Sequence, residues 1–136
     1  MKVLFVCKFN VGRSQTAMEF YNQLRPGGAD SAGTLVDEPG QKLKVRFRAD
    51  AIITAMKELG IDMTENVRKQ IVPEALDRYD QIIVMAEPET VPEWLEKSDK
   101  AVFWKIQDAR DVPLEGTRKI RDEIKAKVEK FVENTR

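Results

Sequence analysis

The chain has 136 residues, with 42% apolar content and 23 basic residues against 23 acidic ones, which fits one domain, residues 1–136, of zero net charge. Zero net charge argues against nucleic acid as a partner, and the absence of an apolar run of ~20 residues argues against a membrane span, so we expect a cytoplasmic protein. One cysteine and no histidine exclude an internal disulfide, a Cys/His zinc site and mechanisms that need an imidazole.

The N-terminal half predicts alternating strands and helices. A β-branched apolar run at residues 2–6 predicts a strand, and the amphipathic stretch 14–24 predicts a helix that Arg25-Pro26-Gly27-Gly28 ends. Residues 29–33 fit a second strand, and residues 49–59 fit a helix closed by Gly60. Residues 41–48 alternate four basic residues with apolar ones. As a strand, this segment would carry all four charges on one face and could form a solvated edge.

The C-terminal half continues the alternation. Residues 81–85 and 101–106 are apolar runs typical of strands buried on both faces, and residues 93–97 fit a short helix between them. From Leu114 onward apolar residues recur at helical spacing, and the charges between them are interpreted as a solvated helix face rather than a nucleic-acid contact. The alternation predicts an α/β protein with a doubly wound parallel sheet, whose ligand site lies beyond the carboxyl ends of the strands.

The loop after the first strand carries the strongest chemical signal. A sulfur at Cys7, facing the start of a helix, is stabilised as a thiolate by the helix dipole and by unpaired N–H groups. Those N–H groups can wrap a tetrahedral oxyanion, and the guanidinium of Arg13 adds a two-pronged donor. Asn10 and Gly12 tolerate a left-handed backbone, and Ser14 can donate a hydrogen bond to the sulfur. The predicted phosphate-binding loop comprises Lys8, Phe9, Asn10, Val11, Gly12, Arg13 and Ser14.

Several segments together resemble a known family. They are V-L-F-V-C-K-F-N-V-G-R-S, D-S-A-G-T from Asp30, M-K-E-L-G-I-D from Met56, Y-D-Q-I-I-V-M from Tyr79 and W-K-I-Q-D-A from Trp104. They resemble the low-molecular-weight protein tyrosine phosphatases and the arsenate reductases built on the same fold. The resemblance implies a three-layer αβα fold around a four-stranded parallel sheet of order 2-1-3-4, with the phosphate-binding loop after the first strand.

The same resemblance implies the remaining site residues. The general acid falls on Asp108, although the family's acid is commonly followed by Pro and here Ala109 follows, so Asp111 before Val112-Pro113 is a rival. Asn66 stands where many members have His, and it could hydrogen-bond toward Asn10 or Ser31 to support the loop. The aromatic residues that flank phosphotyrosine in eukaryotic members are not evident near Asp108 or Thr34. The resemblance also implies that residues 41–48 form the family's variable loop beside the pocket, where their charges could steer anionic substrates.

Three functions follow from this pattern. The leading one is a metal-free phosphatase, without cofactor, that acts on a phosphorylated protein or a small phosphomonoester through a phosphocysteine. The second is an arsenate reductase, to which Gln15 points because family phosphatases usually have Pro there. With one cysteine, such a reductase needs an external thiol: glutathione, mycothiol or a glutaredoxin. The third is a non-catalytic phosphate-binding module, which the presence of both Cys7 and Asp108 disfavours. Asp80, Glu87 and Glu89 are interpreted as ends of secondary-structure elements rather than metal ligands, because the thiolate route needs no metal.

Overall fold

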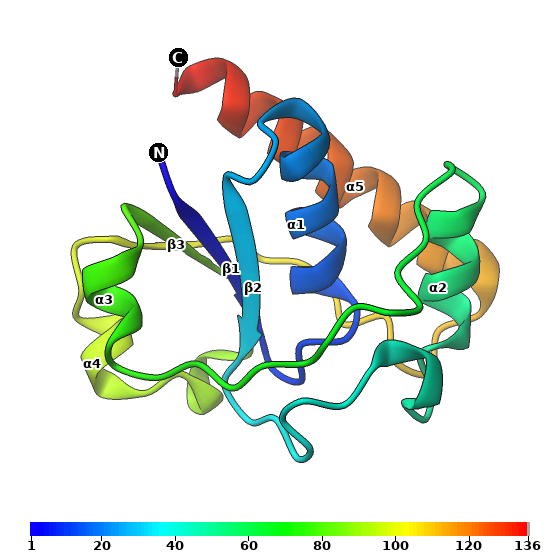
Figure 1. Ribbon diagram of the computed structural model, residues 1–136, viewed down its shortest axis with the longest axis horizontal. Helices are drawn as coiled ribbons and strands as arrows, with labels where there is room; N and C mark the ends of the chain where they lie inside the picture. The colour runs from blue at the N-terminus through cyan, green and yellow to red at the C-terminus, as the bar shows by residue number, and fades with distance from the viewer. Residues whose placement is uncertain (136) are drawn as a thin grey trace.

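A four-stranded parallel sheet forms the centre of the molecule in the computed structural model, which describes residues 1–135 (Figure 1). The strands are β1 (Val3–Cys7), β2 (Ala29–Gly33), β3 (Gln81–Val84) and β4 (Ala101–Phe103). β1 pairs with β2 on one side and with β3 on the other, and β4 pairs with β3, all in parallel. The sheet order β2-β1-β3-β4 confirms the predicted doubly wound α/β topology.

Helices cover both faces of this sheet and make three layers (Figure 1). The helices α1 (Arg13–Leu24), α2 (Asp50–Lys57) and α5 (Leu114–Asn134) lie on one face, and the shorter α3 (Ala75–Arg78) and α4 (Glu93–Glu96) lie on the other. β1 alternates between them, because Phe5 faces the first group and Leu4 faces the second. Two single-turn 3-10 helices, Leu43–Val45 and Pro88–Thr90, complete the structure.

The amphipathic pattern of the long helices explains how the first layer holds together. In α1 the side chains of Ala17, Phe20 and Tyr21 are buried, as predicted, whereas Leu24 in the last turn is exposed. α5 buries Ile120, Ile124, Val128 and Val132, and packs against both α1 and α2. Each such side chain contributes ~1.5–3 kcal/mol on full burial. Within residues 1–135, no helix is both long and apolar enough to cross a bilayer.

The predicted fourth strand is longer and more buried than the real one. β4 ends at Phe103, and both Val102 and Phe103 are exposed. The expectation of burial on both faces is wrong here because β4 lies at the sheet edge, with β3 as its one neighbour.

Residues 41–48 do not form the strand considered from their alternation. Leu43–Val45 is a 3-10 turn, and Lys42 makes a single antiparallel bridge with Val67. The four basic side chains form ion pairs with three carboxylates: Lys42 and Lys44 with Glu65, Arg46 with Asp37, and Arg48 with Asp111. Leu43 is fully buried, so core packing and these ion pairs, rather than strand pairing, determine the backbone conformation of this segment.

Candidate active site

The loop between β1 and α1 lies at the carboxyl edge of the sheet. Asn10 has a φ of 56°, the left-handed conformation that the sequence predicts for it. Gly12, which could also adopt that conformation, has a φ of −95° instead. One left-handed residue is sufficient to turn this loop. Within residues 1–135, the backbone N–H groups of residues 8–12 donate no hydrogen bond, which leaves a row of donors available to an anion.

Cys7 ends β1 immediately before this row of donors and is 2% exposed, and its sulfur lies 3.0 Å from the hydroxyl oxygen of Ser14. Asn10 Nδ2 donates a hydrogen bond to that same oxygen at 2.8 Å. Since the Ser14 oxygen accepts from Asn10, its own hydrogen is free for donation to the sulfur. The predicted contact between Ser14 and Cys7 is therefore present, with Asn10 orienting the hydroxyl.

Arg13 is held almost entirely inside the protein at 3% exposure. Its Nη1 donates to the carbonyl oxygens of Met85 at 2.6 Å and Ile106 at 3.2 Å. The carboxylate of Glu87 accepts from Nη1 at 2.9 Å and from Nη2 at 3.0 Å. Glu87 therefore binds the end of the guanidinium that Nη1 and Nη2 form. Nη2 carries a second hydrogen, and neither this hydrogen nor the one on Nε has an acceptor in the part of the chain that the structure describes. These two N–H groups form a free Nε–Nη2 edge that can hold two oxygens of a tetrahedral anion.

Electrostatics keep this pair ionised. Burial opposes the charge on Arg13, but the hydrogen bonds to Glu87, together with attraction to Cys7, Glu87 and Asp108, raise its pKa above the ordinary value. Hydrogen bonds from Arg13 in turn hold the pKa of Glu87 below its usual range. The sequence reasoning missed this role of Glu87. A signal existed, because Glu87 follows β3, whose carboxyl end meets that of β1 at the same sheet edge.

The two candidate acids occupy different surroundings. Asp108 lines a pocket together with Cys7 and Arg13, and its Oδ2 lies 3.9 Å from Arg13 Nη2. Asp111 lies outside this lining, pairs with Arg48 at 2.8 Å, and leaves 62% of its side chain exposed. The fold therefore places Asp108, rather than Asp111, in the pocket that Cys7 lines.

The supporting network differs from the one expected. Asn66 donates to Gln15 Oε1 at 3.2 Å and to Glu19 at 3.0 Å, not to Asn10 or Ser31. Gln15 Nε2 then donates to Asn10 Oδ1 at 3.2 Å, so Asn66 reaches the loop through one intermediary. The expected direct contact is wrong because the buried Gln15 side chain fills the space between them. Ser31 is buried on β2.

Two further residues that sequence reasoning missed shape the loop from outside. Arg68 is fully buried and donates through Nε and Nη2 to the carbonyl oxygen of Phe9, at 3.2 and 3.0 Å. It also donates to Asp37, which lowers the pKa of that carboxyl to about 2. Gly33 ends β2 where a Cβ atom would lie 2.8 Å from the carbonyl oxygen of Lys8, so a larger residue does not fit.

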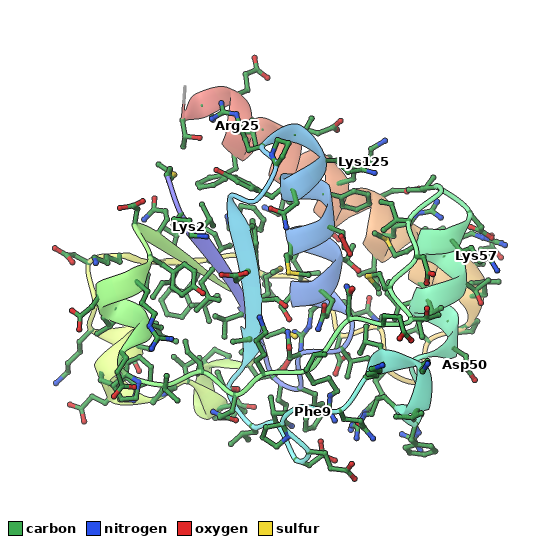
Figure 2. All side chains as sticks on the ribbon, viewed as in Figure 1. Lys2, Phe9, Arg25, Asp50, Lys57 and Lys125 are labelled. Carbon is green, nitrogen blue, oxygen red and sulfur yellow. The ribbon has the colours of Figure 1, made fainter. Side chains whose placement is uncertain are left out.

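Aromatic and basic side chains surround the pocket mouth. Phe9 comes from the loop itself and lies at the carboxyl edge of the sheet (Figure 2), and Phe47 comes from the segment before α2. Sequence reasoning missed both as flanking aromatics, since it considered only the surroundings of Asp108 and Thr34. The complete lining consists of Cys7, Phe9, Val11, Gly12, Arg13, Arg46, Phe47, Arg48, Ala51, Ile52, Asp108, Ala109 and Arg110.

Comparison with known proteins agrees with this geometry. Residues 2–136 match the family model described as low molecular weight phosphotyrosine protein phosphatase. The chain belongs to this family. It is 31% identical over 137 residues to the glutaredoxin arsenate reductase of Synechocystis sp., covering 96% of this chain and 95% of that relative.

Solved structures of the low-molecular-weight phosphatase family match the whole fold. A low molecular weight protein tyrosine phosphatase from T. tengcongensis superposes with a TM-score of 0.84 at 26% identity, covering 98% of this chain and 99% of that one. An arsenate reductase in the phosphate-binding state matches with a TM-score of 0.80 at 27% identity, covering all of both chains. The family thus includes enzymes of both kinds among the relatives of this chain.

Proposed function

We propose that this family member is a phosphatase that hydrolyses phosphomonoesters through a phosphocysteine on Cys7. The observation that supports this most is the convergence of three groups in one pocket: the Cys7 sulfur, the free edge of Arg13 and the Asp108 carboxyl. In the first step, Cys7 attacks phosphorus in line and the bond to the leaving oxygen breaks. The loop amides and Arg13 hold the equatorial oxygens, and Asp108 protonates the leaving oxygen. In the second step, Asp108 takes a proton from the water that attacks the phosphocysteine, and phosphate is released.

The pocket walls favour an aryl ester. Phe9, Val11, Phe47 and Ile52 give the entrance apolar and aromatic sides, which suit a flat ring above the phosphate. A phosphorylated protein or a small aryl phosphomonoester is therefore the proposed substrate.

An arsenate reductase is the second candidate, favoured by the identity to the Synechocystis enzyme and by Gln15. In that reaction Cys7 attacks arsenate and displaces one of its oxygens as water, which forms a sulfur–arsenic bond. An external thiol then attacks the Cys7 sulfur and breaks this bond. Two electrons pass to arsenic, arsenite leaves, and the two sulfurs end as a mixed disulfide that a second thiol reduces. Because the chain has one cysteine, every resolving thiol comes from outside, such as glutathione, mycothiol or a glutaredoxin.

One assay distinguishes the two candidates. We expect hydrolysis of p-nitrophenyl phosphate without added thiol, with arsenate acting as a competitive inhibitor because it mimics phosphate in the same loop. Phosphate release and arsenite formation are measured in parallel, with each of the three thiol systems and with none. Thiol-dependent arsenite formation together with negligible phosphate release would reverse the ranking.

The role proposed for Asp108 predicts a loss that depends on the leaving group. In Asp108→Asn the proton donor is gone, so we expect a ~10²–10⁴-fold lower rate with tyrosyl phosphate. The rate of the first step should fall less with p-nitrophenyl phosphate, because nitrophenolate leaves almost without protonation. Since Asp108 also activates water, the phosphoenzyme should accumulate and give a burst of phenol, which stopped-flow absorbance measures.

Asp111→Asn is the matched control for this prediction. It removes the same charge three residues away but breaks only the exposed pair with Arg48, so we expect little change in rate. A large, leaving-group-dependent defect in Asp111→Asn, with none in Asp108→Asn, would assign the acid to the other residue.

A further inference from the structure

Three cationic side chains surround the aromatic ring of Phe9. The charged groups of Lys8, Arg110 and Arg46 lie 4.9, 5.1 and 5.7 Å from the ring centroid. The ring face attracts each of them, but it also holds three like charges close to one another. The whole chain is electrically neutral, so this local excess does not follow from its composition.

Only part of this positive charge is neutralised. Arg46 pairs with Asp37 at 2.8 Å, and its buried Nε has no hydrogen-bond acceptor among the residues that the structure describes. No carboxylate among residues 1–135 lies within salt-bridge distance of Lys8 or Arg110. An anion arriving between these side chains would relieve their repulsion and accept hydrogen bonds that are now unmade.

The cluster lies directly outside the phosphate cradle. Phe9 is in the same loop as Cys7 and Arg13, and its ring lines the pocket together with Arg46 and Arg110. Figure 2 shows Phe9 at the carboxyl edge of the sheet, and the pocket that Cys7 and Arg13 line is also lined by Phe9. Any group attached next to an aryl phosphate therefore passes these cations.

We propose that Lys8, Arg46 and Arg110 form a second anion subsite around Phe9, which selects phosphotyrosine flanked by acidic residues in a polypeptide. This proposal rests on the phosphatase function proposed above. A small aryl phosphate ends at the mouth and leaves the cations unused. Neighbouring residues of a peptide follow at 3.8 Å per Cα step, so flanking Glu or Asp carboxylates can reach the cluster.

Phosphotyrosine peptides of equal length test the subsite, with Glu, Gln or Lys at the positions on both sides of the phosphotyrosine. We expect kcat/KM for the Glu peptide to exceed that for the Gln peptide about tenfold, as two or three exposed ion pairs would give, and the Lys peptide to be the poorest. The preference should largely disappear in 1 M NaCl, where the Debye length is ~3 Å.

Two variants connect the preference to this cluster. In Arg110→Gln we expect the Glu-to-Gln ratio of kcat/KM to fall about threefold, as loss of one such pair would give. The matched control is Lys127→Gln, which removes a cation from another aromatic ring, that of Trp104 at 5.6 Å, outside the pocket. This control should keep the wild-type ratio.

These results distinguish the subsite proposal from the phosphatase proposal on which it rests. Equal efficiency with all three peptides, or a Glu preference that Arg110→Gln leaves intact, overturns the subsite while the phosphatase function stands. Turnover of p-nitrophenyl phosphate without turnover of any peptide also overturns the subsite. If p-nitrophenyl phosphate itself is not hydrolysed, the phosphatase function fails, and the subsite proposal fails with it.

Discussion

Cys7→Ser is expected to abolish turnover, with a loss of ~10⁴-fold or more, while the protein still binds phosphate or vanadate. A serine hydroxyl is a weak nucleophile at neutral pH, and no imidazole is present to activate it, because the chain has no histidine. The loop should keep its shape, since Asn10 and Ser14 hold each other independently of the sulfur. Release of phosphate measures the first expectation, and isothermal titration with vanadate measures the second.

Two results would contradict this mechanism for Cys7. Residual turnover close to that of the wild type would show that the sulfur is not the nucleophile. Loss of vanadate binding in a variant that still melts cooperatively would show that the sulfur, and not the amides and Arg13, supplies most of the affinity for the oxyanion.

Arg13→Lys is expected to lower kcat/KM by ~10²–10³-fold, the usual effect of removing a donor aimed at developing charge. An ammonium cannot span two oxygens as the free Nε–Nη2 edge does. It also leaves Glu87 and the carbonyl oxygens of Met85 and Ile106 with fewer donors in a buried place, so the melting temperature should fall as well. Steady-state kinetics and thermal unfolding measure the two effects.

Arg118→Lys provides the control for this substitution. Arg118 also binds a carboxylate with two nitrogens, that of Glu58, but this pair is exposed and lies outside the pocket. We expect unchanged kcat/KM and little change in the melting temperature, because exposed ion pairs contribute little to stability. If Arg13→Lys retains near-wild-type efficiency, the two-pronged contact with phosphate is not part of the mechanism.

Features of this protein that depend on local pattern can be predicted from its sequence. The β-branched run before Cys7, the five-residue spacing to Arg13 and the helical recurrence of Ala17, Phe20 and Tyr21 specify a strand, an anion loop and an amphipathic helix. Alternation of strands and helices then restricts the fold to a parallel sheet covered on both faces. These features can be predicted because each depends on residues that lie close together in the sequence.

The tertiary structure alone decided which distant side chains complete the site. Glu87 binds Arg13 across 74 residues of sequence, and Arg68 binds the carbonyl oxygen of Phe9 across 59. The separation of the four basic side chains between Lys42 and Arg48 depends on where Asp37, Glu65 and Asp111 come to lie. Hydrophobic periodicity indicates which face of a helix or strand is buried. The polar partner of a side chain such as Arg13 depends instead on which loops meet at a sheet edge. These loops meet only after the strands have paired, so the sequence pattern does not predict the polar partners.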